Sequence, residues 1–205
     1  MSNNAKMAYL TAFEYGKEDT MEKIKALDAQ GVTYIELLVP FSDPVAENPE
    51  IQDASLRALQ NGCTIEKIFD MLQELQGSLQ AKIILSLYIN TAFRYGYERF
   101  CKKAAECGVF GLIGEDLPFE ERMELKTVAN SYGLQVINIL ARCSEERTER
   151  IAQDAQGILC VSPSLNDAIS EEDFDAIIAR VKKLCSVPVL VKSNSAENSR
   201  FLVEA

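Results

Sequence analysis

The sequence predicts an α/β fold in which short parallel strands alternate with helices, either a TIM (β/α)8-type barrel or a doubly wound open sheet. One unit repeats along the chain: an apolar strand, a polar loop, an amphipathic helix and a glycine. The spacing of these glycines is nearly constant, with 25 residues from Gly108 to Gly133 and 24 from Gly133 to Gly157. The strands are apolar throughout, which is typical of a parallel sheet covered by helices on its faces.

Seven segments are predicted to be strands because they are short, apolar and poor in polar alternation. They are Met7–Thr11, Tyr34–Val39, Ile83–Tyr88, Val109–Ile113, Leu134–Ile139, Ile158–Val161 and Pro188–Val191. A barrel needs eight strands, whereas an open sheet accepts seven. Only Lys192–Ala205 follows the seventh, too little for another βα unit. No G-x-G-x-x-G motif follows the first strand, which disfavours a dinucleotide-binding sheet.

Helices are predicted where apolar residues recur at spacings of three and four. The clearest lie at Thr64–Leu75 and at Glu171–Cys185, and the second has Ser170 as its N-cap with Asp173 in the capping-box position. Four more are expected near Glu18–Gln30, Tyr97–Cys107, Phe119–Tyr132 and Ser144–Ala155. Left-handed C-terminal caps are expected at Gly31, Gly108, Gly133 and Gly157. No linker or break in composition interrupts the chain, so residues 1–205 are predicted to form a single domain.

The composition excludes several classes of function. The chain has 205 residues, 31 acids, 21 bases and a formal charge of −10. Because no cluster of Lys and Arg stands against that charge, nucleic acid and anionic membranes are not expected partners. Without histidine, the chain cannot use Ser-His-Asp or Cys-His catalysis or histidine-ligated zinc.

The cysteines and the hydropathy pattern indicate a cytoplasmic protein. The six cysteines form no C-x-x-C pair and several lie in apolar segments, so we expect buried reduced thiols. No signal peptide precedes the first strand, and no apolar run approaches the ~18 residues that cross a bilayer. A reducing compartment fits both observations.

Glu36 is the first candidate for chemistry because it lies inside the apolar segment Thr33–Val39. A buried carboxylate is costly unless it is neutralised, paired or kept for a purpose. An acid with a raised pKa can donate and accept protons near neutral pH. A structural salt bridge inside a barrel is the alternative that the residues leave open.

Two acidic loops follow predicted strands. Pro40–Pro49 contains three prolines together with Asp43 and Glu47, which suits a rigid loop that positions a substrate or a partner. Gly114–Pro118 places Glu115 and Asp116 at the end of the fourth strand. These carboxylates leave open a magnesium site or simple solvated loops.

These segments, taken in order, resemble the α subunit of tryptophan synthase. The matching stretches are Ala8–Ala12, Ile35–Gln52, Ala58–Gly62, Tyr88–Phe100 and Asp116–Pro118. The P-F-S-D-P-x-A loop after an E-L strand is the most specific of these signatures. The resemblance covers most of the chain, weakens after about Leu140, and implies a TIM barrel with seven βα units visible and the last strand apparently missing.

The resemblance implies a lyase that cleaves indole-3-glycerol phosphate by a retro-aldol reaction to indole and glyceraldehyde 3-phosphate in tryptophan biosynthesis. Glu36 matches the general acid/base of the family. Glu47 matches the carboxylate that binds the indole N–H, where the family usually has aspartate. Tyr9 and Tyr88 match aromatic positions near the indole.

The resemblance also implies a partner. Asp43, Asn90, Phe93 and Pro118 match positions that lie toward the β subunit in the family. Pyridoxal phosphate belongs to that β subunit, so no cofactor is expected in this chain.

This chain differs from the family in the loops that bind the substrate phosphate in the family. The family's S-R-x-G-V-T-G and G-F-G-I-S segments correspond to Ser162–Ala168 and to Lys192, Ser193, Asn194 and Ser195, which contain no glycine. Side chains of the second group could still bind phosphate. The eighth strand with its G-S-A turn is also absent, so the sequence is either an incomplete portion of a longer protein or a shortened variant. Two alternatives therefore stay open: a paralogue without turnover that regulates a β-type subunit, and a barrel lyase or aldolase for another phosphorylated substrate.

Overall fold

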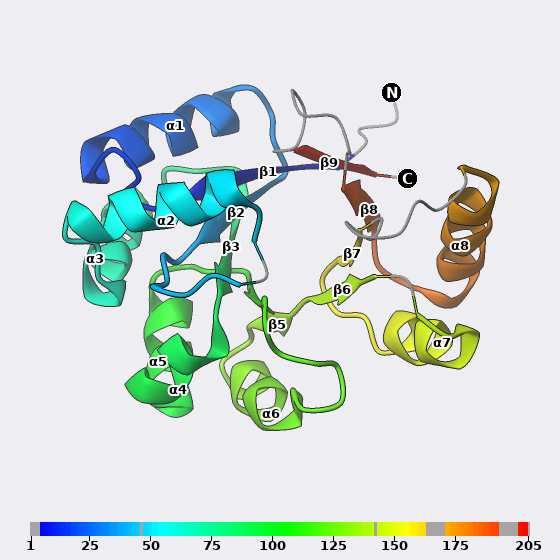
Figure 1. Ribbon diagram of the computed structural model, residues 1–205. Coiled ribbons are helices and arrows are strands. Elements are labelled where there is room, and N and C mark those ends of the chain that lie inside the picture. The colour runs from blue at the N-terminus through cyan, green and yellow to red at the C-terminus, as the bar shows by residue number, and fades with distance from the viewer. Residues whose placement is uncertain (1–4, 46, 142, 163–170, 193–200, 205) are drawn as a thin grey trace. The chain divides into compact units, whose positions relative to one another are not determined.

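A computed structural model describes residues 5–45, 47–141, 143–162, 171–192 and 201–204, without the side chains of residues 171–174, 192 and 201–204. Strands and helices alternate along these segments (Figure 1). Contacts within the chain divide it into two compact units. The N-terminal unit is Ala8–Val136, and the C-terminal unit is Ile137–Ala205 together with Met1–Met7. The single domain over residues 1–205 stays a prediction.

The N-terminal unit contains a sheet whose strands follow one another in chain order. They are β1 (Lys6–Thr11, which begins in the other unit), β2 (Tyr34–Leu38), β3 (Lys82–Leu87), β4 (Gly111–Gly114) and β5 (Gln135–Val136). The pairs β2–β3, β3–β4 and β4–β5 are parallel. Their carboxyl ends therefore lie at the same edge of the sheet, which is where parallel α/β folds carry their functional groups.

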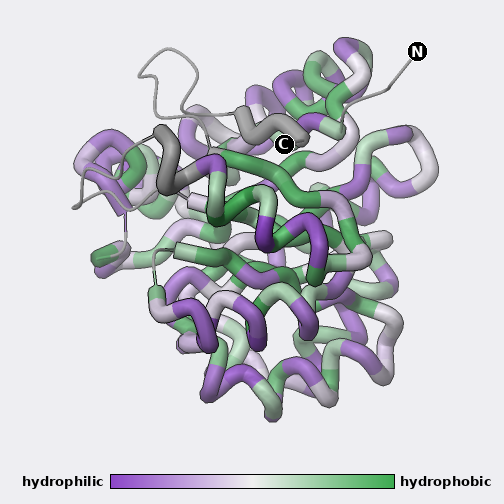
Figure 2. The backbone as a smooth tube through the Cα atoms, turned by 90° about the vertical axis from the view of Figure 1, so that its right-hand side faces the viewer, coloured by the Kyte–Doolittle hydropathy of each residue, from purple (hydrophilic) through white to green (hydrophobic). Residues whose placement is uncertain are grey.

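Six helices connect these strands. They are α1 (Lys17–Ala29), α2 (Pro49–Gln60), α3 (Ile65–Leu75), α4 (Ile89–Tyr95), α5 (Tyr97–Glu106) and α6 (Met123–Ser131). Helix α3 contacts both α1 and α5, and it buries one apolar face that includes Ile68, Phe69 and Leu72. Figure 2 shows this pattern along the chain, since the strands are largely green while the helices alternate between green and purple.

The C-terminal unit repeats the arrangement with shorter strands. Its elements are β6 (Asn138–Leu140), α7 (Glu145–Gln153), β7 (Leu159–Val161), α8 (Glu171–Leu184), β8 (Val189–Lys192) and β9 (Phe201–Glu204). Strands β6, β7 and β8 pair in parallel, whereas β9 runs antiparallel to β8. Strand β9 was not among the seven predicted strands.

All seven predicted strands are present, with one difference. The segment predicted as one strand at Leu134–Ile139 is divided into β5 and β6 by Ile137. Strand β5 pairs with β4 and strand β6 pairs with β7, so the break falls at the boundary between the two units. Hydropathy alone could not locate this break because Val136 and Ile137 are equally apolar and both buried.

Capping side chains explain where the predicted helices begin and end. The Thr64 and Ser144 hydroxyls accept backbone N–H bonds of 3.3 Å from Lys67 and Arg147 at the starts of α3 and α7. The predicted glycine caps are confirmed at Gly31, Gly108 and Gly133, which directly follow the C-cap residues of α1, α5 and α6 and have φ between 76° and 77°. Gly157 also has a positive φ of 66°, but α7 ends at Gln153 with Asp154 as its C-cap, so the predicted cap at Gly157 is wrong.

Two helices were not predicted, α2 and α4. Asn48 caps α2 by accepting a 3.0 Å bond from the Ile51 N–H, and Pro49 occupies the first helical turn. The prolines of this region predict a rigid loop, and the structure shows that one of them also begins a helix. An Asn-Pro pair ahead of an apolar period is nevertheless a helix-start signal, because proline at the first turn costs no hydrogen bond.

The six cysteines are free thiols, as predicted. Cys63, Cys101, Cys107 and Cys160 are buried, whereas Cys143 and Cys185 are half-buried. Burial raises the pKa of the Cys63 thiol to about 12 and that of Cys101 to about 11. Such thiols stay protonated near neutral pH and behave as small apolar core residues.

Candidate functional site

The candidate site lies in the N-terminal unit, at the carboxyl ends of β2, β3 and β4. The strand register places its polar residues on one face of the sheet. Glu36 lies opposite Ile84, and Ser86, two residues further along β3, lies opposite Ile113. Since side chains two residues apart in a strand share a face, Glu36, Ser86 and Glu115 share a face.

Glu36 is a buried carboxylate in an apolar strand. Its exposed fraction is 7%, and its neighbours Ile35 and Leu37 on the opposite face are fully buried. Glu36 takes part in at least one interaction, and its charge acts on the phenol of Tyr9. The burial that the sequence predicted for this carboxyl group is confirmed.

Glu47 occupies a loop whose backbone is fixed at several points. Its N–H donates to the Pro44 carbonyl at 3.1 Å, and its own carbonyl accepts a 2.9 Å bond from the Gln52 side chain. The next residue, Asn48, is the N-cap of α2. Glu47 is therefore held between a proline-containing turn and a helix start, so its position is rigid at the backbone level.

Tyr9, on β1, has a phenol on which the charges of several of these acids act. Burial raises the pKa of the Tyr9 phenol well above its usual value, and the charges of Glu47, Glu36 and Glu115 raise it further. The Tyr9 hydroxyl is therefore within the electrostatic reach of three carboxylates, one on β2 and one in each of the loops after β2 and β4.

Glu115 is fixed by β3. The fully buried Ser86 hydroxyl donates a hydrogen bond to Glu115 Oε1, and the Glu115 N–H donates to the Leu87 carbonyl at 3.0 Å. A Cβ on Gly114 would lie 2.8 Å from Leu117 Cβ, so only glycine allows the tight turn that follows β4. From the sequence, Glu115 is recognisable as an acid at a strand end but not as a residue of this site.

Aromatic stacking joins the loops after β2 and β3. The rings of Phe41 and Tyr88 are stacked, with centroids 4.9 Å apart and planes 10° apart. Tyr88 is 1% exposed. The Asp116 carboxylate accepts a 2.7 Å bond from the Ile89 N–H, which ties the loop after β4 to the start of α4. These contacts hold three neighbouring loops together.

The four residues that the resemblance placed toward a partner are all exposed. Asp43 follows β2, Asn90 and Phe93 lie on α4 after β3, and Pro118 follows β4. Because these strands are neighbours in the sheet, the four residues lie over the same strand ends. Phe93 is 67% exposed, and Val45, which sequence analysis missed, is 83% exposed.

The predicted phosphate-binding residues cannot be placed. Ser193, Asn194 and Ser195 lie outside the described residues, as does most of Ser162–Ala168. Lys192 ends β8, but its side chain is not among those described.

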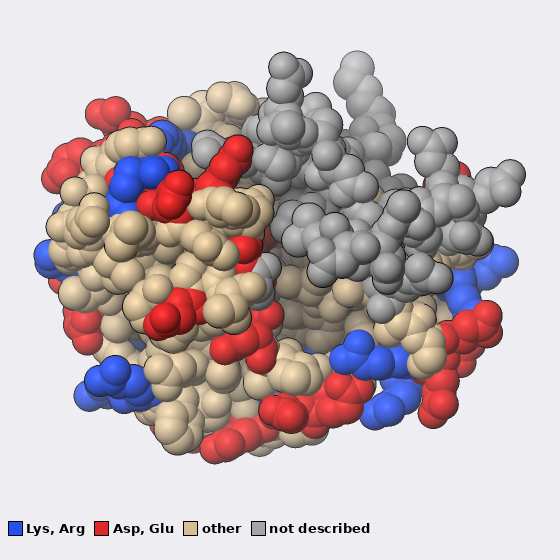
Figure 3. All heavy atoms as spheres, viewed as in Figure 1, with Lys and Arg blue, Asp and Glu red and all other residues tan. Residues whose placement is uncertain are grey.

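The sequence left a magnesium site open, and it predicted neither nucleic acid nor a membrane as a partner. Among the described residues, no group of three or more acids or cysteines is arranged to hold a metal ion. On the face in Figure 3 the basic side chains are scattered among acidic ones and do not form a continuous patch. None of the helices within the described segments combines the length and the apolar character that a bilayer span requires.

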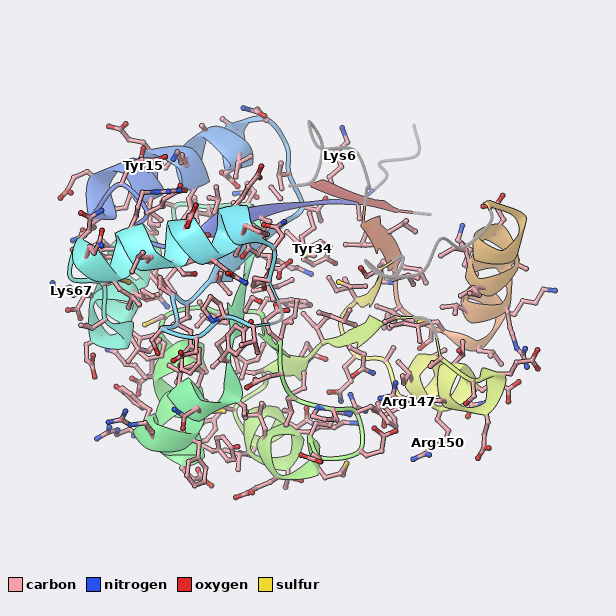
Figure 4. All side chains as sticks on the ribbon, in the orientation of Figure 1. Lys6, Tyr15, Tyr34, Lys67, Arg147 and Arg150 are labelled. Atoms are coloured by element: carbon pink, nitrogen blue, oxygen red, sulfur yellow. The ribbon has the colours of Figure 1, made fainter. Side chains whose placement is uncertain are left out.

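Tyr15, between β1 and α1, is an exposed aromatic residue outside the site (Figure 4). Lys23 Nζ lies 4.7 Å from the Tyr15 ring centroid and the Arg57 guanidinium carbon 5.7 Å from it. Arg57 also donates a 2.5 Å bond to the buried Glu14 carboxylate. This cluster ties the first loop to α1 and α2, and we interpret it as structural.

Sequence reasoning missed Ser86 and Phe41 as members of the site. Ser86 carries a usable signal, because a serine in the otherwise apolar segment Lys82–Leu87 needs a hydrogen-bond partner when it is buried. Phe41 carries none, since an aromatic residue in a loop is compatible with many packing arrangements.

Comparison with known families gives a match over nearly the whole chain. A family model described as tryptophan synthase alpha chain matches residues 1–193. A tryptophan synthase alpha chain of Alkaliphilus metalliredigens is 41% identical over 159 residues, which cover 77% of this chain. One from Prochlorococcus marinus is 37% identical over 192 residues, or 91% of this chain. The chain spans 60% of the length of the first relative and 70% of the second.

Solved structures give the same family. The chain superposes on a tryptophan synthase alpha subunit from Campylobacter jejuni with a TM-score of 0.84 and 26% identity, covering 95% of this chain and 79% of the other. A Pyrococcus furiosus structure, described as a tryptophan synthase a2b2 complex, gives 0.82 and 30%, with coverages of 90% and 76%. These similarities decide between the two folds left open by the sequence pattern, and the TIM-barrel fold class is confirmed.

Proposed function

Because this chain belongs to the tryptophan synthase alpha chain family, we propose that it is a lyase that cleaves indole-3-glycerol phosphate to indole and glyceraldehyde 3-phosphate. The reaction is a retro-aldol cleavage and would serve tryptophan biosynthesis. The observation that supports the proposal most strongly concerns Glu36. Its carboxyl group is buried, and its charge acts on the same Tyr9 phenol as the charge of Glu47 does.

Glu36 is the proposed general acid and base. Breaking the carbon–carbon bond requires a proton at the ring carbon that leaves and removal of a proton from the glycerol hydroxyl that becomes the aldehyde. One carboxyl group can do both in turn if its pKa lies near the working pH. Burial and nearby negative charge both favour the protonated form of a carboxyl group, and Glu36 is buried and shares its site with two other acids.

Glu47 is proposed to accept a hydrogen bond from the indole N–H, and Tyr9 and Tyr88 are proposed to contact the indole ring. A second carboxylate beside the ring nitrogen stabilises the positive charge that protonation of the ring creates. The fixed backbone around Glu47 supports this role, because positioning errors of about 1 Å can cost ~100-fold in rate.

The remaining assignments rest on the family. We propose Lys192, Ser193, Asn194 and Ser195 as the phosphate-binding group, a β subunit that carries pyridoxal phosphate as the partner, no cofactor in this chain, and a cytoplasmic location. The alternative of a paralogue without turnover has no support among the relatives named above.

Indole release is the direct test. The purified chain is incubated with indole-3-glycerol phosphate, alone and with a tryptophan synthase β subunit, and indole is measured over time. Turnover in either condition is the expected result. If indole is not formed in either condition while the reaction of the β subunit is stimulated, the proposed lyase activity is contradicted. That result would support the alternative of a regulatory paralogue without turnover.

Replacing Phe93 with alanine is expected to weaken association with the β subunit by about tenfold or more. Exposed aromatic residues at the centre of an interface carry a large share of its binding energy, and Phe93 is 67% exposed on α4. Titration calorimetry with a β subunit measures the change. Leu56→Ala on α2 is the matched control, because Leu56 is 55% exposed and no residue of the proposed interface lies on that helix. Equal loss of affinity in both variants, or in neither, contradicts the proposed interface.

A further inference from the structure

Basic side chains gather where α4 meets α5, which is an exception to the expectation that this acidic chain has no cluster of Lys and Arg. Residues 94–103 contain four bases, Arg94, Arg99, Lys102 and Lys103, and one acid, Glu98. Figure 3 shows a small group of basic side chains at its lower left, where Figure 1 draws α4 and α5. Four bases do not make the extended basic surface that nucleic acid requires, so the group points to a local contact with an acidic surface.

Neither ion pairs nor helix ends account for these charges. No described acid lies within ion-pair distance of any of the four bases. The Glu98 carboxylate instead accepts a 2.8 Å hydrogen bond from the Tyr132 hydroxyl. Arg94 suits the last turn of α4, but Arg99 lies in the first turn of α5, where the positive end of the helix dipole disfavours a cation. The position of Arg99 therefore does not serve the stability of its helix.

Two aromatic contacts fix Arg99 relative to Phe93. The Arg99 guanidinium carbon lies 4.1 Å from the centroid of the Tyr95 ring. The Phe93 and Tyr97 rings meet edge to face, with their centroids 6.1 Å apart. Both contacts join α4 to α5. Because Phe93, Arg94 and Arg99 are all exposed, this turn presents one aromatic residue and two cations in a fixed arrangement.

An apolar centre with a polar or charged rim is the usual anatomy of a protein interface. Phe93 belongs to the surface proposed for the β subunit, and Arg94 follows it directly in α4. Charges at a rim add little to affinity, but they steer the approach of a partner of opposite charge. A chain with a net charge of −10 repels an acidic partner over most of its surface. A local group of cations therefore determines which face such a partner meets first.

We infer that Arg94 and Arg99 form a basic rim beside Phe93 that steers the β subunit, and that the surface of the β subunit facing this rim is acidic. The inference rests on the proposed function in one respect, namely that the partner is a tryptophan synthase β subunit. It extends that function by naming the charge of the partner surface. It also assigns the two arginines to the rate of association, whereas Phe93 determines the lifetime of the complex.

Charge reversal tests the basic rim. Stopped-flow measurements with a tryptophan synthase β subunit are expected to show that Arg94→Glu and Arg99→Glu each lower kon by about fivefold or more at low ionic strength. The loss should shrink to within about twofold in ~1 M salt, where the Debye length is only ~3 Å. The value of koff should change by less than about twofold in either variant, since a rim charge acts mainly before docking.

Lys25→Glu is the matched control. Lys25 is an exposed base on α1, and no residue of the proposed interface lies on that helix. Its reversal changes the net charge by the same amount as Arg94→Glu does, so an unchanged kon within about twofold shows that position and not total charge matters. Arg94 is exposed, so Arg94→Glu decides the question if Arg99→Glu, which loses the contact with Tyr95, does not fold.

Three results would overturn the basic rim even when the β subunit binds and indole is released. The first is an equal decrease of kon in Arg94→Glu and Lys25→Glu, and the second is a decrease that is as large at high salt as at low salt. The third is self-association of the chain alone at low salt, measured by sedimentation, that Arg94→Glu abolishes. In that case the occupant of the surface is a second copy of the chain. Faster association of the arginine variants also contradicts the inference, because the facing surface would then be basic.

The basic rim and the lyase activity can fail separately. A salt-dependent loss of kon that is confined to the arginine variants, in a complex that releases no indole, supports the basic rim and contradicts the lyase activity. If the unchanged chain does not bind the β subunit at either salt concentration, the partner and the basic rim are both contradicted. Indole release by the chain alone would still support the lyase activity in that case.

Discussion

Replacing Glu36 with glutamine is expected to slow indole release by about 10²–10⁴-fold, the usual contribution of a general acid or base. Glutamine keeps the shape of the side chain and one of its two acceptor oxygens but cannot transfer a proton. The substrate should therefore still bind, with KM changed by less than about threefold while kcat falls. Steady-state assays of indole formation with the β subunit present measure both quantities.

The stability of this variant separates catalysis from folding. Glu36 is 7% exposed, and removing the charge of a buried carboxyl group does not create a cavity. The Tm of Glu36→Gln should therefore differ from that of the unchanged chain by no more than a few degrees. Glu22→Gln is the matched control, since Glu22 is an exposed acid on α1 and its loss should change neither rate nor stability. A Glu36→Gln variant that keeps its activity would mean that another group transfers the proton.

The fold was predictable from the sequence because its signals are local and periodic. Parallel strands buried by helices must be apolar on both faces, and left-handed helix ends favour glycine. Both constraints act on single residues, so they are visible without knowledge of distant contacts. The division of Leu134–Ile139 into β5 and β6 was not visible, because it depends on which neighbouring strand each half pairs with.

The part of the candidate site that could be predicted is the part in which a polar residue lies within a segment expected to be buried. Glu36 attracts attention because a carboxyl group in an apolar strand requires a reason. The influence of the Glu47 and Glu115 charges on Tyr9 was not predictable from spacing, since the three residues come from segments whose placement depends on strand order and register. The resemblance to a family supplied Glu47 and Tyr9 but gave no role to Glu115.

Replacing Phe100 with alanine is expected to lower the free energy of unfolding by about 3–5 kcal/mol, the usual cost of removing a large aromatic side chain from a core. Phe100 is fully buried on α5. Its ring centroid lies 5.4 Å from that of Phe69 on α3 and 6.0 Å from that of Tyr95 on α4, with the ring planes inclined at 61° and 83°. Phe69 and Tyr95 also contact each other at 5.8 Å. The three rings therefore join three helices, and removing Phe100 leaves only one of the three edge-to-face contacts, that between Phe69 and Tyr95.

For a chain of this length such a loss corresponds to a decrease in Tm of roughly 6–20 °C, which calorimetry or circular dichroism can measure. Phe93→Ala is the matched control, because Phe93 lies on the neighbouring helix α4 but is 67% exposed, and its truncation should cost less than about 0.5 kcal/mol. The two phenylalanines thus have opposite expected effects: Phe100 determines stability and Phe93 determines partner binding. If Phe100→Ala unfolds at the same temperature as Phe93→Ala, the aromatic cluster does not hold α3, α4 and α5 together.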